Sequence, residues 1–523
     1  MSPNWPTHYR AYVPHESNLY ARGSMLYDYD VVVIGSGAGG GTFAYACAQA
    51  GKRVLLLERG YNATSNEPIH DEQAMLIDKK PYDDRPVRVN GSERLLYMGG
   101  VLGGGTSLYG AALMRPSVED FHPGEQYGER IPRAIWDWPI TYKTLERYYT
   151  KAEMLYGVSG CADEDYGPLQ RPRNGYPHKP LPLKPINRRL VVANQARGLR
   201  PFRLPLAIDF DRCLQCASCP GYACINDSRR SSARLVARGI EEKLSLDVFA
   251  GVEVERFARD AAGRVNGVRV RDRATGRRAE YRAKRYALAA GALASPTLLL
   301  RSGVEGRWIG RHYMMHLSPI VVGLFGKRTG GDETYIKQIG FADYYLGSRR
   351  YPHKMGIVQS LPVPGPLLLR KMTRGRVPLR VVEFLRKRML PLTGIVEDLP
   401  NPANRVCLGA GGRAELCHRF SRFDRERGRH LSRLMRRILR NAGALFCLAK
   451  SFPSSEHVAH QCGTLRFGSD PSHAAVDADC RLFGQPNVFV VDGSILPTSL
   501  GVGPALTIMA NALRVADVVG REI

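Results

Sequence analysis

His460 lies in the stretch HVAHQCGTLRFGSD, close to a cysteine, a glycine and a threonine. An imidazole titrates near neutral pH, so a histidine in a binding site can take a proton from a substrate hydroxyl. His460 and Cys462 could also bind a metal ion, but the motif supplies no further ligands. A lone histidine is most often structural. The motif therefore makes His460 a candidate base, and the rest of the chain must position it.

Four cysteines gather in DRCLQCASCPGYACINDSR, with the spacing Cys213-x2-Cys216-x2-Cys219-x4-Cys224. The run resembles the C-x2-C-x2-C-x3-C-P pattern of bacterial ferredoxins, but its last spacing is longer and no proline follows Cys224. Four thiolates could instead hold zinc in a tetrahedral site. An iron–sulfur or zinc site is one alternative. Reduced thiols or local disulfides are the interpretation that we prefer, and we assign no metal.

The elements that could hold a large ligand begin near the N-terminus. DYDVVVIGSGAGGGTFAYACAQAGKRVLLLERG predicts a strand at 31–34, a glycine turn, a helix and a second buried strand at 54–57. The turn fits G-x-G-x-x-G, and an acidic residue closes the second strand. This context favours a dinucleotide-binding unit over a glycine-rich turn in an unrelated α/β domain.

Each conspicuous residue of this unit has a physical role. Gly35 permits the tight turn, Gly37 lets the backbone approach a pyrophosphate, and Gly40 lets the helix pack on the strand. The free N–H groups of the helix then point at the phosphates. Glu58 can accept hydrogen bonds from a ribose diol. The unit does not by itself separate FAD from a nicotinamide cofactor.

Three later stretches extend the pattern. LLYMGGVLGGGTSLYG is a glycine-rich backbone that can lie against a flat ligand. YALAAGALASPTLLLRSG predicts a buried strand, a turn at Gly291 and a helix that starts at Ser295 and Pro296. NVFVVDGSILPTSLGVGPALTIMANALRVADVV predicts a strand, a turn at Asp492 and Gly493, a loop and a final helix.

Composition excludes some classes of protein. The chain has 523 residues, of which 44% are hydrophobic, and this is typical of a globular enzyme with more than one domain. The net charge of +26 is spread over the chain without a zinc-finger or aromatic-basic pattern, so we expect a solvated surface and no nucleic-acid binding. The segment 366–390 is densely basic and could lie on a membrane surface, but Pro378 interrupts it and favours a basic flap.

The first 25 residues contain no continuous apolar core of the kind that an export signal needs. No later run reaches the roughly 18 apolar residues of a membrane span. Eleven cysteines are too few for a disulfide scaffold. We therefore expect a cytoplasmic protein without a transmembrane segment.

Taken together, these motifs resemble the glucose-methanol-choline (GMC) family of FAD-dependent oxidoreductases. The resemblance rests on the dinucleotide unit, the glycine-rich loop at 98–110, WPITYKTLERYYTKAEMLYGVSG, the Ser-Pro segment, IGRHYMMH and the C-terminal HQCGT…DP…VDGS…P…LT. It implies an α/β fold, with a Rossmann-like FAD-binding domain and an inserted α+β substrate-binding domain. We expect the first at 27–115, 225–315 and 456–523, and the second, with the cysteine-containing insertion, at 116–224 and 316–455.

The resemblance also implies roles for particular residues. Residues expected to hold FAD are Gly35, Gly37, Gly40, Glu58, Gly104, Gly105, Val254, Asp492, Gly493, Pro504 and Ala505. No histidine lies between Gly99 and Gly110, where some members attach FAD covalently, so we expect a non-covalent flavin. His460 matches the histidine that takes the substrate hydroxyl proton while a hydride leaves for flavin N5.

Two positions depart from the family pattern. Gly503 stands where a second catalytic histidine or asparagine is usual, and Tyr109 replaces an asparagine in the flavin loop. Either His460 works with a neighbour such as Thr498, Ser499 or Tyr109, or the flavin does other chemistry.

The predicted function is FAD-dependent oxidation of a CH–OH group on a sugar, aminosugar or polyol-like small molecule. The electron acceptor is oxygen or unknown. The alternatives are oxidation of a steroid or lipid alcohol, and a catalytically altered FAD-binding protein.

Overall fold

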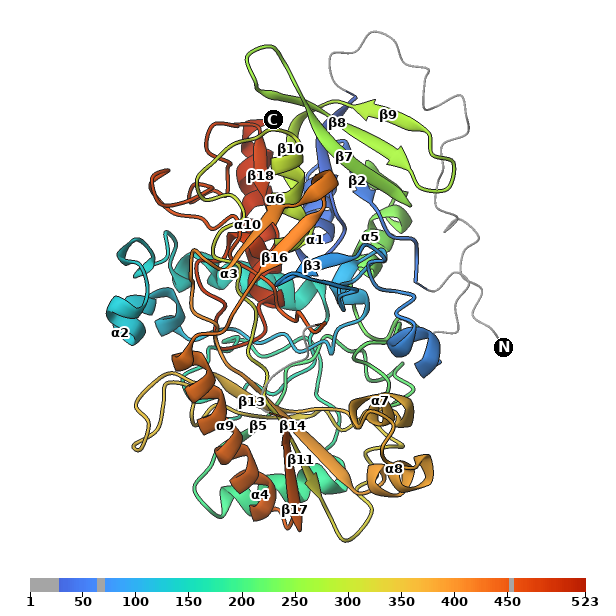
Figure 1. Ribbon diagram of the computed structural model, residues 1–523, viewed down its shortest axis with the longest axis vertical. Helices are drawn as coiled ribbons and strands as arrows, with labels where there is room; N and C mark the ends of the chain where they lie inside the picture. The colour runs from blue at the N-terminus through green and yellow to red at the C-terminus, as the bar shows by residue number, and fades with distance from the viewer. Residues whose placement is uncertain (1–27, 64–70, 451–455) are drawn as a thin grey trace.

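The computed structural model describes residues 28–63, 71–450 and 456–523, in an elongated molecule with one large sheet toward each end (Figure 1). The prediction that no export signal is present concerns residues that lie outside this described part. Within it, no helix is long and apolar enough to cross a bilayer.

The first large sheet is parallel and carries the predicted dinucleotide unit. Its buried strands are rich in Val and Leu, as expected for a parallel sheet that is covered on its faces. The order is β18 (Val488–Val490), β10 (Ala283–Leu288), β1 (Tyr29–Ile34), β2 (Val54–Glu58) and β6 (Leu246–Ala250). The predicted strands and the α/β class are confirmed.

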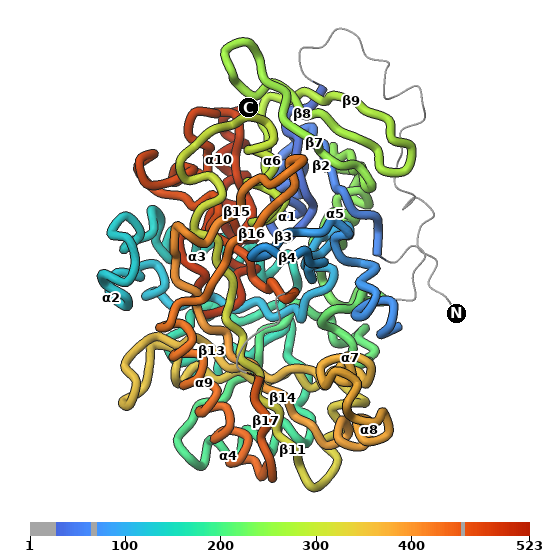
Figure 2. Tube along the Cα trace, in the orientation of Figure 1, coloured from blue at the N-terminus to red at the C-terminus, as the bar shows by residue number. Residues whose placement is uncertain are grey.

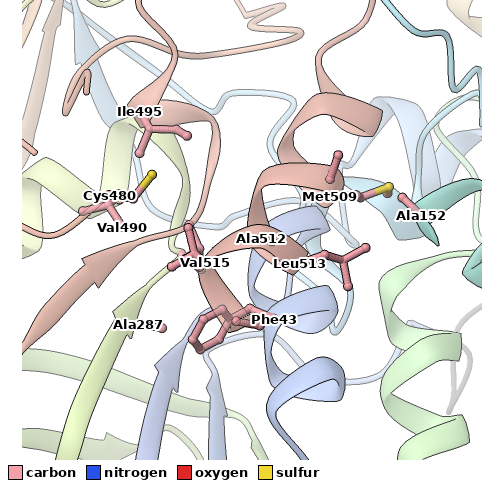
Figure 3. Packing of buried hydrophobic residues seen from close by; sticks show 14 of the residues in the cluster. Phe43, Ala152, Ala287, Cys480, Val490, Ile495, Met509, Ala512, Leu513 and Val515 are labelled. Atoms are coloured by element: carbon pink, nitrogen blue, oxygen red, sulfur yellow. The ribbon is translucent and has the colours of Figure 1, made fainter. Parts of the chain in front are cut away.

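Helices of this half come from distant parts of the chain. They are α1 (Ala38–Gln49), α5 (Ser232–Glu241), α6 (Gly291–Arg301) and α10 (Ala505–Glu522). Helix α1 packs against α10 and α5, and α10 packs against α3 (Tyr142–Leu155). Figure 3 shows Phe43 of α1 beside α10, and Ala152 of α3 facing Met509, all fully buried. The C-terminal helix therefore completes the core around the glycine turn.

The second large sheet is antiparallel and lies toward the other end of the molecule (Figure 1). Helix α9 (Arg422–Asn441) packs on one face of it and also contacts α4 (Pro185–Gln195). Apolar residues of α9 such as Leu431 and Met435 are fully buried there. The strand order is β17 (Phe446–Lys450), β11 (Ile320–Leu324), β14 (Met389–Ile395), β13 (Ile357–Ser360), β12 (Ile339–Phe341) and β5 (Pro201–Arg203).

Two smaller sheets and three short helices accompany the two large sheets. One sheet is formed by β7 (Val252–Arg259), β8 (Val265–Asp272) and β9 (Arg278–Tyr281), and the other by β15 (Arg405–Leu408), β16 (Ala414–Cys417), β3 (Val87–Val89) and β4 (Ser92–Arg94). The helices are α2 (Pro123–Tyr127), α7 (Pro366–Met372) and α8 (Leu379–Arg386). Pro378 precedes α8, so the predicted interruption of the basic segment is confirmed.

The strands of the two large sheets come from separate parts of the chain. Those of the parallel sheet fall within 27–115, 225–315 and 456–523, and those of the antiparallel sheet fall within 116–224 and 316–455. The sheet β15-β16-β3-β4 combines strands from both sets. The division into two domains therefore stays a prediction.

One predicted boundary is wrong. Helix α6 begins at Gly291, so Pro296 lies inside the helix and not at its start. Proline has no N–H and leaves the carbonyl four residues earlier, that of Ala292, without its helical partner. Thr464 Oγ1 donates to this carbonyl at 2.7 Å. A long-range contact with the HQCGT stretch thus lets the helix start one turn earlier.

A fully buried ionic network lies where α9 and the antiparallel sheet meet the segment after β4. Lys354 Nζ pairs with Glu397 at 2.8 Å and with Asp120. Tyr345 donates to Asp120 and Tyr127 to Glu397, each at 2.5 Å. Burial opposes the ammonium, but the two carboxylates outweigh it and raise the pKa of Lys354. The charge of the two buried carboxylates is therefore compensated only while the lysine is protonated.

We expect Lys354→Met to lower the free energy of unfolding by about 3–5 kcal/mol, because it leaves two buried carboxylates without their cation. Urea unfolding measures this loss. One carboxyl should then keep a proton in the folded state, so its pKa is raised, and the loss should be larger at pH 8 than at pH 5. Arg133→Ala breaks an exposed pair with Glu129 and should barely move the midpoint. Equal midpoints for Lys354→Met and the parent would contradict the assignment.

Candidate functional site

The glycine turn after β1 is built from close backbone contacts. Gly35 has a φ of +97°, and its N–H donates to Leu57 O at 2.8 Å. A Cβ on Gly39 would lie 1.7 Å from Val491 O, and one on Gly40 would lie 1.9 Å from Gly35 O. Only glycine fits these positions, so the N-terminus of α1 sits directly on the turn and against the chain after β18.

Other glycines of the site border open space. No atom lies within 4 Å of the position that a Cβ would take at Gly37 or Gly105. Gly104 approaches the turn, where a Cβ would lie 3.1 Å from Gly37 Cα. The glycine loop at 103–107 therefore lies beside the N-terminus of α1 and leaves its backbone open to a ligand.

A cavity of about 1480 Å³ begins at this turn and extends to the antiparallel sheet. It exceeds the roughly 300–1,000 Å³ of ordinary small-molecule pockets, so it can hold a large cofactor together with a substrate. Gly40 is absent from its lining and packs behind the turn. The other predicted ligand contacts line it together: Gly35, Gly37, Glu58, Gly104, Gly105, Val254, His460, Asp492, Gly493, Pro504 and Ala505.

Glu58 ends β2 at the wall of this cavity. Its Oε2 accepts from Ser36 N at 3.0 Å and from Ser36 Oγ at 2.6 Å, and its Oε1 accepts from Gly60 N at 2.7 Å. Burial raises the pKa of the carboxyl against these hydrogen bonds. Oε2 thus already accepts two hydrogen bonds, whereas Oε1 accepts one and keeps room for a further donor, such as a ligand hydroxyl.

Asp492 lies between β18 and α6. Its Oδ2 accepts from Gly291 N at 2.8 Å and from Ser295 Oγ at 2.5 Å, and its Oδ1 accepts from Ser494 N at 2.8 Å and from Ser494 Oγ. These bonds join the start of α6 to the chain after β18. The carboxylate thus positions backbone that borders the cavity.

His460 is held at the cavity wall by its neighbours in the chain. Cys462 exchanges backbone hydrogen bonds with Met314, at 2.9 and 3.0 Å, and Thr464 Oγ1 donates to the carbonyl of Ala292. Gly463 has a φ of +92°, and a Cβ there would lie 2.3 Å from His312 O. The tight packing fixes the HQCGT backbone against the segment 312–316 and brings His460 beside His316.

The two histidines form a hydrogen-bonded chain with one arrangement of protons. His316 Nε2 lies 2.8 Å from Leu500 O, and its Nδ1 lies 2.8 Å from Nδ1 of His460. A carbonyl only accepts, so Nε2 of His316 donates and its Nδ1 is the acceptor in the neutral ring. Nδ1 of His460 must then donate. This leaves a lone pair on Nε2 of His460.

Both imidazoles are neutral at physiological pH. Burial lowers the pKa of His316 to about 4. Burial, and then the positive charges that His316, His457 and Lys337 can carry, hold the pKa of His460 well below 6.5. The Nε2 lone pair of His460 is therefore free to accept a proton at neutral pH.

Gly503 lies directly beside this lone pair. A Cβ on Gly503 would be 3.5 Å from Nε2 of His460, so the glycine leaves space next to the nitrogen. The three side chains that were predicted to work with His460 do not fill this space. Ser499 is hydrogen-bonded to the backbone of Asp398, Thr498 is buried away from the cavity, and the Tyr109 hydroxyl donates to Arg230 O.

Two residues of the site were not predicted as functional from the sequence. The sequence distinguishes His316 only as part of IGRHYMMH, and nothing in the sequence around Lys337 marks it as functional. Lys337 is 4% exposed and lines the cavity, and its Nζ donates to Gly110 O at 2.7 Å. Burial lowers its pKa to about 8, and no carboxylate in the described residues pairs with it. It places an ammonium near His460.

The cysteine run lies at the edge of the same cavity, which Cys216 lines. All four cysteines are free thiols, and burial raises the pKa of Cys219 to about 12. Within the described residues, no group of three or more His, Cys, Asp or Glu side chains is arranged to hold a metal ion. His457 also lines the cavity, and its side chain is exposed to solvent.

Comparison with known proteins gives a consistent match. Family models described as GMC oxidoreductase match residues 29–318 and 415–512. The 6'''-hydroxyparomomycin C oxidase of Streptomyces lividus is 29% identical, over 95% of this chain and 92% of its own, and the paromamine 6'-oxidase of Streptomyces fradiae is 27% identical over the same shares. The crystal structure of pyridoxine 4-oxidase from Mesorbium loti has a TM-score of 0.64 at 21% identity, covering 94% of this chain and 98% of that one.

The hydrogen-bonded chain predicts the tautomers of both histidines. In protein labelled with ¹⁵N-histidine, His460 should give the spectrum of a neutral ring protonated at Nδ1, and His316 that of a neutral ring protonated at Nε2. Both should stay neutral at pH 6, because each pKa lies below that of a free histidine. The variants His316→Gln and His460→Gln assign the signals. A proton on Nε2 of His460 would refute the arrangement.

Proposed function

This chain belongs to the GMC oxidoreductase family of FAD-dependent enzymes that oxidise CH–OH groups, and on this premise we propose that His460 is its general base. The observation that carries the proposal is the hydrogen-bonded chain that leaves Nε2 of His460 unprotonated beside the open space at Gly503. The substrate that we propose is a sugar, aminosugar or polyol-like alcohol.

The residues at the glycine turn fit FAD. The open backbone at Gly37 and Gly105 suits a pyrophosphate, because N–H groups at the N-terminus of α1 are free to donate. Glu58 suits the ribose diol, Val254 the adenine end, and Pro504 and Ala505 the flavin ring. We propose a non-covalent flavin, since no histidine stands between Gly99 and Gly110.

In the proposed reaction, bound FAD supplies the acceptor for the hydride that leaves the substrate carbon. Nε2 of His460 takes the proton of the substrate hydroxyl, so the alcohol becomes a carbonyl compound. His316 acts through His460: it accepts the Nδ1–H and keeps the ring in the tautomer that can act as a base. Lys337 places a positive charge where negative charge develops on the substrate oxygen.

The name of each Streptomyces relative contains an aminoglycoside, and this supports an aminosugar among the candidate substrates. Gly503 favours a bulky substrate, because the space beside Nε2 of His460 can hold a substituent that an asparagine or histidine side chain would exclude. A steroid or lipid alcohol is the second candidate, and apolar lining residues such as Val322, Leu361 and Leu368 support it. We propose oxygen as the electron acceptor.

We propose a cytoplasmic location, which the eleven free cysteines support, because thiols persist in reducing compartments. We also propose that the parallel sheet with its helices is the FAD-binding domain and that the antiparallel sheet belongs to the substrate-binding domain.

We expect His460→Ala to retain FAD and to slow flavin reduction by about 10²–10⁴-fold, the usual contribution of a placed general base. Anaerobic stopped-flow absorbance, with the best substrate found in a screen of aminoglycosides, polyols and sterols, measures this rate. In the parent, a base must be deprotonated to act, so the rate should rise with pH and level off below pH 6.5. If the flavin of the variant were reduced as fast as that of the parent, the proposal would be wrong.

Glu58→Gln should weaken FAD binding by about 10- to 100-fold, because the amide replaces a charged acceptor of similar shape. Fluorescence titration of the apoprotein with FAD measures the affinity. Glu242→Gln is the matched control: Glu242 accepts from Tyr45 at 2.9 Å and does not line the cavity, so its affinity should not change. Equal losses in both variants would remove Glu58 from the binding site.

A further inference from the structure

Large apolar side chains are unusually exposed at one end of the molecule. In the described residues, Phe384, Leu445, Phe446 and Leu448 are 57–68% exposed, and Met372 and Val381 are each 44% exposed. Single exposed apolar residues are common, but such a cluster marks an interaction surface. All six come from two short segments, 366–388 and 445–450.

The first segment is the hairpin of α7 and α8. Helix α7 fully buries none of its side chains and α8 fully buries only Val382, while Leu368, Leu369 and Leu385 are partly buried against the core. The segment 366–388 contains eight Lys and Arg residues against a single acid, Glu383. Arg388 lies over the ring of Phe384, 3.9 Å from its centroid, so apolar and basic groups are interleaved.

The second segment is β17, the edge strand of the antiparallel sheet. Phe446 pairs with Leu324, Leu448 with Val322 and Lys450 with Ile320. Directly paired residues point to the same face of a sheet, and Ile320, Val322 and Lys450 line the cavity. Phe446 and Leu448 therefore continue the cavity floor outward to the edge, on the face opposite α9.

The two segments meet around the opening of the cavity. Lys371, Met372 and Arg374 are exposed and also line the cavity, so it reaches solvent beside α7. Met389, directly after the hairpin, pairs with Leu324, which pairs on its other side with Phe446. Figure 2 shows α7, α8 and β17 toward the same end of the molecule. We call residues 366–388 and 445–450 the mouth face.

We propose that the mouth face docks on a bilayer that contains anionic lipid. Phe and Leu side chains can enter the interfacial region, while the surrounding Lys and Arg remain level with the headgroups. An acidic protein or nucleic acid would be complementary to the charges but not to the exposed Phe and Leu. Docking places the opening of the cavity at the membrane surface.

Helix α9 provides an internal comparison. It exposes Arg433, Arg436 and Arg440 on the other side of the antiparallel sheet, but none of its large apolar side chains is exposed. If charge alone caused binding, this face would serve equally well. Of these two faces, only the mouth face combines basic side chains with exposed large apolar side chains, and the proposal requires that combination.

Vesicle flotation of the FAD-loaded protein tests the proposal. Phosphatidylcholine vesicles with about 30% phosphatidylglycerol should retain the parent protein, and vesicles of pure phosphatidylcholine should not. Removing three charges with Arg376→Gln, Arg380→Gln and Lys387→Gln should weaken binding about 100-fold, since each basic residue near an anionic surface contributes about fivefold. None of the three lines the cavity.

Phe384→Ser with Phe446→Ser should also lose retention, whereas Arg433→Gln, Arg436→Gln and Arg440→Gln together should keep it. Unchanged flavin absorbance and melting temperature establish that each variant is folded. Three results would overturn the proposal: no retention of the parent, equal loss in the α9 variant, or full retention of the Phe variant, which would indicate a purely electrostatic polyanion site. A dimer that only the Phe variant loses, without vesicle binding, would assign the face to a second copy of the chain.

Discussion

The carbonyl of Leu500 sets the proton positions of the candidate site. Because this oxygen can only accept, it requires a proton on Nε2 of His316, and that proton in turn requires one on Nδ1 of His460. His460 and Leu500 have φ values of +63° and +66°, a region that non-glycine residues rarely adopt. Strain of this kind persists only where the surrounding structure determines it, and it is concentrated at functional sites.

Three separate parts of the chain must therefore keep a fixed distance from one another. Backbone hydrogen bonds between Cys462 and Met314 hold the segment of His460 against the segment of His316. Thr464, which follows His460, donates a hydrogen bond to Ala292 O in α6. Asp492 joins α6 to the chain that continues to Leu500. The antiparallel sheet, the parallel sheet and the C-terminal helix thus converge on one pair of imidazoles, and each could be displaced only by breaking buried hydrogen bonds.

Local patterns in the sequence predicted the parts of this arrangement that depend on local geometry. The strand-turn-helix unit follows from the apolar run and from glycines such as Gly35 and Gly40, which backbone contacts require. His316 escaped prediction because its partner lies 144 residues away, and Lys337 because nothing nearby in sequence marks a buried ammonium. The start of α6 was predicted wrongly for the same reason. Pro296 can lie inside the helix because Thr464, which is distant in sequence, donates to the carbonyl of Ala292 that the proline leaves without a partner.

A low pKa makes His460 a weak base in isolation, yet the proposed proton transfer depends on a difference between two groups. The positive charge of Lys337 disfavours an imidazolium at His460, and it favours an alkoxide-like oxygen on a substrate in the same cavity. The two effects offset each other in the transfer from hydroxyl to Nε2, because donor and acceptor lie in one field. A neutral His316 behind the ring adds no negative charge that would hold the proton after transfer. In the proposed mechanism, the proton can therefore leave His460 easily once the carbonyl product has formed, and Gly503 keeps the path between the imidazole and the cavity open.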